Sequence, residues 1–151
     1  MRWHYLLRIN GILLIFLGLS MVFPIICSLI YRDCSLYPFI LSTIITVSTG
    51  ASLFLSSGRE EIEYINQKEA MLIVTLGWSV IGLFGALPLY LSDYNLSFTD
   101  SFFESISGFT TTGSSILTNI EGLSKSLLLW RSLIQWLGGM GIIVLSLAIL
   151  P

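Results

Sequence analysis

The sequence predicts an all-α integral membrane protein with four transmembrane helices, and three observations lead to this fold class. Of its 151 residues, 54% are hydrophobic and only 11% are charged, whereas a soluble domain carries roughly 25% charged residues. The mean hydropathy is +0.87. The apolar residues gather into four runs, each close to the roughly 20 helical residues that cross a hydrocarbon core of about 30 Å. A soluble single domain is therefore excluded.

The first two runs predict a hairpin of membrane helices over residues 1–58. Ile9 to Tyr31 holds no ionised side chain, and Pro24 is the expected kink because proline lacks a backbone donor. The run is longer than the apolar part of a signal peptide and no A-x-A site closes it, so we expect a retained anchor. The second run, 34–58, is also uncharged, and its serine and threonine hydroxyls can bond to helix carbonyls in lipid.

Segment 59–69 separates this hairpin from the rest of the chain. Its six ionised groups are too costly for hydrocarbon, at about 2.5–3.5 kcal/mol for each Arg, Lys or Asp at a helix centre, and they predict an aqueous loop. The third span then covers 70–92, where Pro88 is expected to bend the far end. The fourth span, 127–150, has one charge, Arg131. Three glycines of the third span allow another helix to approach closely, namely Gly77, Gly82 and Gly85.

The basic residues near the span ends predict the orientation, because cytoplasmic segments are enriched in Lys and Arg. Four of them lie at the amino terminus and in segment 59–69, and three lie on the other side: Arg2, Arg8, Arg59 and Lys68 against Arg32, Lys125 and Arg131. This count favours both termini and the 59–69 loop in the cytoplasm. Segment 93–125 is then outside.

Segment 93–125 is too polar for a lipid-facing span and too apolar for an ordinary loop. Ser97 and Asp100 form an S-x-x-D helix start, and phenylalanines recur at helical spacing, which predicts a short helix over 98–109. This helix is too short to cross the membrane, but it can enter and turn back. The residues that follow, 110–114, are called here the filter segment; three threonines and Gly113 favour an extended strand with special backbone angles at the glycine.

Unpaired carbonyls at membrane depth are tolerated only where protein buries them or they line a watery cavity. One use of such a segment is an ion filter, in which carbonyl oxygens replace the hydration shell of potassium or sodium. The carbonyl end of the short helix adds a negative partial charge of roughly half an electron, which also favours a monovalent cation. The alternative is an extracellular loop with an incidental Ser/Thr turn, and the residues alone leave both open.

Two long motifs resemble the first pore repeat of the Trk-type potassium uptake transporters. The first is FTDSFFESISGFTTTG at 98–113, and the second is LWRSLIQWLGGMGIIV at 129–144. They occur in the order and at the interval that the family shows, and the family also places two extra helices ahead of its first repeat. The resemblance implies two leading transmembrane helices plus one helix–re-entrant pore loop–helix repeat over 70–151.

In that arrangement 70–92 is the outer helix, 98–109 the pore helix, 110–114 the filter and 127–150 the inner helix. The resemblance implies that the backbone of four filter residues supplies this repeat's share of the potassium site, namely Thr110, Thr111, Thr112 and Gly113. It also implies a multi-pass protein of the bacterial inner (plasma) membrane, a homodimer and a cytoplasmic nucleotide-binding regulatory subunit. Membrane lipid is the other expected partner.

The sequence departs from the family because it holds one pore repeat instead of four. We therefore expect a fragment or an interrupted gene, since a transmembrane run leads directly to Pro151. The main hypothesis is potassium transport by the ion-conducting subunit or its amino-terminal part. The alternative is a truncated, non-conducting membrane protein with a structural or assembly role. No enzyme activity and no cofactor are expected, and the scattered basic residues exclude nucleic acid as a partner.

Several side chains near the expected filter have two interpretations. Glu104 can raise the local cation concentration together with Asp100, or it can accept hydrogen bonds from the filter backbone and hold its shape. Arg131 can pair with Glu104 or Glu121, but snorkelling to the headgroups is the expectation for a charge at a helix end. The glycines of 138–141 favour either close helix packing or a bend beside the pore.

The remaining conspicuous side chains are expected to be structural. Cys27 and Cys34 match neither a disulfide framework nor a zinc site. His4 is a lone residue near the terminus and is expected to be solvated. The tryptophans at 3, 130 and 136 are interpreted as interface or packing residues instead of a binding cage.

Overall fold

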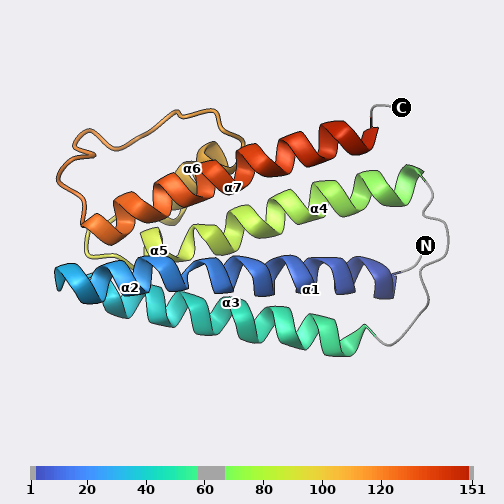
Figure 1. The fold of residues 1–151 in the computed structure, drawn as a ribbon, viewed down its shortest axis with the longest axis horizontal. Helices are drawn as coiled ribbons and strands as arrows, with labels where there is room; N and C mark the ends of the chain where they lie inside the picture. Colours follow the sequence, from blue (N-terminus) through green and yellow to red (C-terminus); the bar gives the residue numbers. More distant parts are fainter. Residues whose placement is uncertain (1–2, 58–66, 150–151) are drawn as a thin grey trace.

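The computed structural model describes residues 3–57 and 67–149 as an all-helical bundle. Four helical stretches are long and apolar enough to cross a membrane: His4–Tyr31, Leu36–Ser56, Glu69–Tyr90 and Lys125–Ile143. They lie side by side with their long axes roughly along one direction (Figure 1). The loop expected over 59–69 lies outside the described residues up to position 66. Within the described ranges no strand occurs.

The first membrane helix is interrupted once. Helix α1 spans Trp3–Ser20 and α2 spans Val22–Tyr31, with Met21 as a turn between them. Pro24 causes this break because it has no N–H for the carbonyl of Ser20 and its ring crowds that carbonyl. The expected kink therefore exists, but it lies about one turn before the proline itself.

Helix α3, Leu36–Ser56, forms the second arm of the hairpin and packs mainly against α1. The two helices touch backbone to backbone at Gly11 and Gly50: a Cβ on Gly11 would lie 2.8 Å from the Gly50 carbonyl oxygen. Five hydroxyls of α3 bond to carbonyls of their own helix, as expected in lipid; the Ser42 Oγ–Pro38 O distance is 2.7 Å, whereas the buried Thr46 hydroxyl has no partner among the described residues.

The third membrane helix is also broken by a proline. Helix α4, Gln67–Gly85, and the single turn α5, Leu87–Tyr90, are separated at Ala86, two residues before Pro88. The indole N–H of Trp130 donates to the carbonyl of Gly85, with an Nε1–O distance of 3.0 Å. Trp130 has no exposed surface, so this tryptophan belongs to the core and satisfies a carbonyl at the end of α4.

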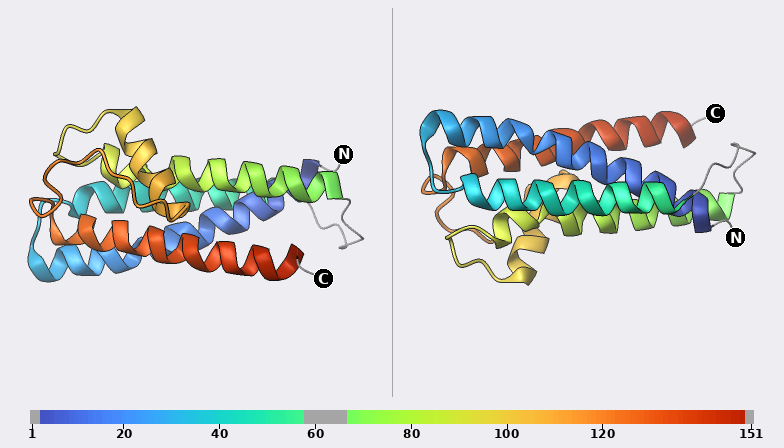
Figure 2. Two further views of the ribbon diagram at one scale, coloured as in Figure 1. Left: turned by 90° about the horizontal axis from the view of Figure 1, so that it is seen from above. Right: turned by 90° about the horizontal axis from the view of Figure 1, so that it is seen from below.

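The segment between the third and fourth spans enters the bundle and returns. Helix α6, Phe98–Phe109, runs from one end of the bundle towards its middle, and residues 110–124 return to the same end (Figures 1 and 2). Helix α7, Lys125–Ile149, then spans the full length. The start of α1 and the end of α7 lie at the opposite end of the bundle (Figure 1). The segment is thus re-entrant in shape.

Asp33, which lies between α2 and α3, connects the hairpin of the first two membrane helices to α7 through hydrogen bonds. Its carboxylate accepts hydrogen bonds from the Ser126 N–H at 3.1 Å, the Ser126 hydroxyl at 2.8 Å and the Ser28 hydroxyl at 2.5 Å. It also accepts one from the Ser35 N–H. Burial raises the pKa of this carboxyl, but the bonds from the three serines outweigh burial and hold the pKa below its usual value. Asp33 thereby caps the first turn of α7 from a distant part of the chain.

Candidate functional site

Helix α6 is positioned by its cap and by the glycines of α4. The Ser97 hydroxyl accepts the N–H of Asp100 at 3.1 Å, which is the capping contact that the S-x-x-D pattern predicts. A Cβ on Gly82 or Gly85 would collide with Ile106 or Phe109 of α6. These glycines therefore let α6 lie directly against the α4 backbone, and they fix the depth at which α6 ends.

The carboxyl end of α6 closes in a Schellman motif. The N–H of Thr111 donates to Gly108 O at 2.9 Å, and the N–H of Thr112 donates to Ser107 O at 3.0 Å. This pattern needs a residue in the left-handed region after the C-cap, and Thr111 occupies it with φ 55°. Glycine is the usual residue there, so threonine at this point carries strain of about 1–2 kcal/mol.

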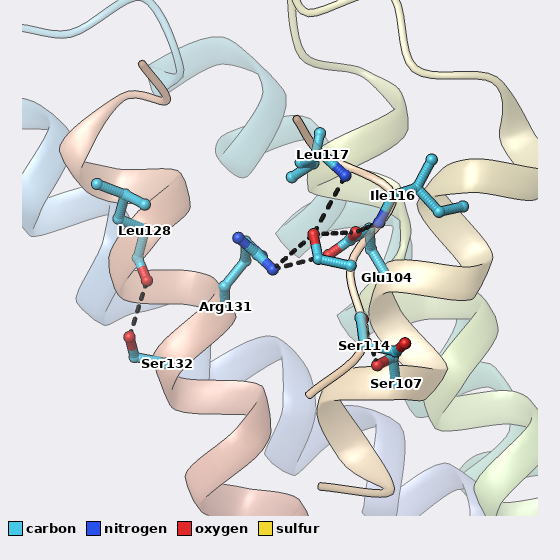
Figure 3. Close-up of polar contacts among 9 residues, drawn as sticks. Glu104, Ser107, Ser114, Ile116, Leu117, Leu128, Arg131 and Ser132 are labelled. Atoms are coloured by element: carbon cyan, nitrogen blue, oxygen red, sulfur yellow. Dashed lines mark hydrogen bonds and ion pairs between the residues drawn. The ribbon is translucent and has the colours of Figure 1, made fainter. Parts of the chain in front are cut away.

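The filter segment continues from this cap with a second left-handed residue, Gly113, at φ 72°. The carbonyl of Ser114 accepts the Ser107 hydroxyl at 2.5 Å (Figure 3). In the described part of the chain, no donor bonds to the carbonyls of Thr111, Thr112 or Gly113. These residues are exposed, and they sit at the negative end of the α6 dipole. The segment therefore presents free carbonyl oxygens where a cation is favoured.

The return from the filter segment is held by Glu104. Its Oε1 accepts the Ile116 N–H and the Ser115 hydroxyl, both at 2.6 Å. Its Oε2 lies 2.9 Å from Arg131 Nη2, and the same nitrogen donates to Ser115 Oγ at 3.2 Å. Figure 3 shows Arg131 reaching from α7 across the return segment towards Glu104 on α6. Glu104 is only 3% exposed. Its buried charge is compensated by the Arg131 cation and by two hydrogen bonds.

This geometry decides between the two interpretations of each charge. The expectation that Arg131 snorkels to the headgroups is wrong, because its guanidinium is paired with Glu104 inside the protein. Glu104 accepts hydrogen bonds from the backbone that follows the filter segment, as the structural interpretation predicted. A buried, paired carboxylate is not free to concentrate cations with Asp100 at the mouth.

Helix α7 makes its closest approach to the site at Gly138. A Cβ there would lie 1.9 Å from the carbonyl oxygen of Phe109, the last residue of α6. No such contact exists at Gly141, where nothing lies within 4 Å of the position of a Cβ. Of the two interpretations of the glycine cluster, close packing therefore holds at its first residue. Gly138, Met140 and Gly141 also line an apolar cavity between α1, α4 and α7.

The structure differs from the sequence-based expectation at the start of the filter segment. Three threonines predict an extended strand, but Thr110 and Thr111 form the turn that caps α6, because the helix carbonyls need these N–H groups. The left-handed conformation expected at Gly113 is present. Sequence reasoning missed Ser107, whose carbonyl and hydroxyl both bind the segment, and it missed Asp33. A lone acid at the end of an apolar run was the available signal for Asp33.

Of the other singled-out residues, few contribute to this site. Cys27 and Cys34 are free thiols, and His4 is exposed. Trp136 is 61% exposed on α7, whereas the side chain of Trp3 is outside the described atoms. The four expected site residues, Thr110–Gly113, lie together at the end of α6.

The chain is a multi-pass membrane protein in which a capped half-helix leads into a re-entrant segment with free carbonyls, and a full-length helix follows. This architecture is typical of ion-transport proteins. Comparison with known proteins places it further. Residues 36–151 match the family model described as TrkH, cation transport protein. The chain belongs to this family.

Similar relatives carry names of one transport system. The Trk system potassium uptake protein TrkH of Halomonas elongata is 46% identical over all of this chain, and TrkH of Vibrio parahaemolyticus is 40% identical. TrkG of Escherichia coli is 32% identical over 93% of the chain. The chain spans about a third of these relatives, between 29% and 31% of their length.

A solved structure agrees with these relatives. The crystal structure of the potassium transporter TrkH from Vibrio parahaemolyticus superposes with a TM-score of 0.94 at 39% sequence identity. The match covers the whole of this chain and 32% of that one. The all-helical membrane fold and the course of the re-entrant segment are therefore shared with a transporter.

Proposed function

We propose that this chain forms one side of a potassium-selective filter in a Trk-type uptake system, as the amino-terminal part of its ion-conducting subunit. In this proposal 70–151 is the first pore repeat, and the backbone of Thr110, Thr111, Thr112 and Gly113 supplies its share of the potassium ligands. The observation that carries the proposal is the filter segment itself. In the described part of the chain, three of its carbonyls accept no hydrogen bond at the end of the α6 dipole, those of Thr111, Thr112 and Gly113, while Ser107 and Glu104 hold the segment through hydrogen bonds.

The chemistry follows from this arrangement. Carbonyl dipoles replace the hydration shell of a monovalent cation, and the carbonyls themselves carry no formal charge. The ion therefore binds weakly enough to leave again. The Schellman turn and the Ser107 hydroxyl fix the two ends of the segment. No enzyme chemistry is proposed, and potassium is the cargo of the site, not a resident cofactor.

The whole system implied by the family has further parts. We extend the proposal to a location in the bacterial inner membrane, a homodimer and a cytoplasmic nucleotide-binding regulatory subunit. Family membership is the support for these three parts. Coupling to protons or sodium is not part of the proposal.

The test uses a full-length chimera, in which this chain replaces the matching 31% of the Vibrio parahaemolyticus relative. Gly113→Asp forces a side chain onto a residue with φ 72° and adds a carboxylate beside the ion. We expect rubidium influx to fall about tenfold or more, or the preference for potassium over sodium to be lost. Thr111→Ser keeps the carbonyl and the hydroxyl and is the matched mild variant.

Influx is measured at equal membrane abundance, with sodium as competitor. If Gly113→Asp matches the parent in both influx and selectivity, the filter segment is an ordinary loop and the proposal fails. If the parent chimera conducts nothing while the intact relative does, the alternative of a non-conducting chain with a structural role is favoured.

A further inference from the structure

One face of α7 follows the filter segment along its length. Arg131, Gln135 and Gly139 recur at four-residue spacing and thus share a side of the helix. Arg131 forms an ion pair with Glu104 next to the segment. Gly139 lies beside Thr111, with 3.6 Å from its would-be Cβ to Thr111 Cγ2. The residue between them on this face, Gln135, therefore lies level with the middle of the filter segment.

The amide of Gln135 points towards Gly113. Among the described atoms, its Nε2 is the one neighbour within 4 Å of the position that a Cβ on Gly113 would take, at 4.0 Å. In the described part of the chain this amide has no hydrogen-bond partner, and neither has the carbonyl of Gly113. Gln135 is exposed, and its amide thus lies beside the backbone of Gly113 without a protein partner of its own in the described ranges.

Gln135 and Gly113 both line a cavity beside the filter segment. The cavity has a volume of about 200 Å³, and its lining combines three apolar side chains, Ile120, Leu128 and Ile134, with six polar ones: Glu104, Ser107, Ser114, Arg131, Ser132 and Gln135. Since a water occupies about 30 Å³ of liquid volume, the space admits several ordered waters that can bind its polar side chains.

We propose that Gln135 is a positioning residue for the filter, which binds the backbone of Gly113 and Ser114 through water in this cavity and thereby sets the preference for potassium over sodium. This inference rests on the proposed function of the segment. Discrimination by the size of the site requires that the carbonyls keep a fixed spacing from the ion, and within the described ranges the free stretch of Thr111 to Gly113 has no other polar support from α7.

The residue type fits this role. An amide both donates and accepts, so it can bond to either backbone group. The amide carries no charge, so it supports the segment without repelling a cation. An unpaired arginine at this position would repel the cation. The charge of Arg131, one turn away, is already compensated by Glu104.

The experiment compares Gln135→Met with Ser132→Ala in the full-length chimera. Methionine keeps the length of the side chain and removes its hydrogen bonds. Ser132 lines the same cavity, but its hydroxyl donates to Leu128 O of its own helix at 3.0 Å, which makes it the matched control. We expect the potassium-to-sodium preference to fall about fivefold in Gln135→Met, the factor that one net hydrogen bond supplies, and to stay unchanged in Ser132→Ala.

A second readout does not depend on transport. Amide hydrogen exchange of peptides covering 110–117 should be faster in Gln135→Met and unchanged in Ser132→Ala. Faster exchange with lower selectivity supports the proposal, and an unchanged potassium preference in Gln135→Met overturns it. If the Gln135→Met protein does not accumulate in the membrane, Gln135→Asn replaces it, because asparagine is shorter by one methylene and moves the amide away from the segment. The potassium preference and the hydrogen exchange of this variant are then judged in the same way.

Failure of the proposed function has a different signature. A parent chimera that carries no rubidium counts against the filter itself and removes the selectivity claim with it. The exchange data then still show whether Gln135 holds the segment: equal exchange in all variants overturns that part as well.

Discussion

At the scale of single residues, the filter segment contains two left-handed residues that differ in how easily they adopt this conformation. Gly113 adopts φ 72° without cost, whereas Thr111 adopts φ 55° against the preference of a β-branched residue. The Schellman cap requires this conformation wherever the helix is followed by a turn of this type. The strain at Thr111 is therefore a consequence of how α6 ends.

This strain predicts the sign of a stability change. Thr111→Gly removes the left-handed strain and should raise the free energy of unfolding by about 0.5–1 kcal/mol, after the entropy cost of glycine. Thr112→Gly is the matched control because Thr112 is not left-handed and also loses a hydroxyl contact. It should lower stability by about 0.5–1 kcal/mol. Thermal unfolding of the purified full-length chimera in detergent measures both, and equal losses would refute the strain.

At the scale of elements, the position of α6 depends on glycines in both flanking helices. Gly82 and Gly85 admit it against α4, and Gly138 admits the end of α6 against α7. The contact at Gly138 is with backbone, which cannot move aside as the end of a side chain can. Gly108 of α6 is also tight against Ile134 of α7, so the spacing of these two helices at the filter depends on both missing side chains.

Gly138→Ala should therefore separate α7 from α6. The added methyl would lie 1.9 Å from Phe109 O, and the overpacking should cost about 1–3 kcal/mol or more and reduce transport. Gly141→Ala meets nothing within 4 Å and gains helix propensity of about 1 kcal/mol, so it should be at least as stable as the parent. Melting temperature and rubidium influx of the two alanine variants provide the comparison; similar behaviour would contradict the packing argument.

The Asp33 contact joins the leading hairpin to α7 and makes that junction sensitive to acid. Because the folded pKa lies below the usual Asp value of about 3.9, the carboxylate contributes stability above about pH 4. The contribution is lost as the pH falls through the lower folded pKa. Asp33→Asn should cost about 1–3 kcal/mol at neutral pH, since it weakens bonds to a charged acceptor.

The measurement is thermal unfolding of parent and Asp33→Asn between about pH 7 and about pH 3. The difference between them should be constant down to about pH 4 and then shrink. Asp93→Asn is the control, because Asp93 is exposed and makes no hydrogen bond or ion pair in the described ranges. A difference that grows towards low pH would contradict the assignment.

At the scale of the whole molecule, four spans place the beginning of α1 and the end of α7 on one side and the return segment on the other (Figure 1). The basic-residue count predicts that the first side is cytoplasmic. Cysteine labelling tests this orientation in the full-length chimera with Cys27 and Cys34 replaced by serine. Thr118→Cys, at an exposed position of the return segment, should react with an impermeant thiol reagent outside intact cells, and Ser56→Cys at the end of α3 should not. The reversed pattern would overturn the orientation.

The sequence by itself determined the four spans, the helix over 98–109 with its Ser97 cap, and the left-handed glycine at 113. These features depend on residues that are neighbours along the chain, since hydropathy runs, helical spacing and capping act within a few positions. The tertiary structure alone decided the pairing of Arg131 with Glu104, the capping of α7 by Asp33 and the approach of Gly138 to Phe109. Asp33 and Ser126 are 93 positions apart, and a contact between such residues arises only when packing brings their helices together. Sequence periodicity therefore identifies the elements of this membrane protein, while the distances between their backbones decide which charges pair and where the filter segment is held.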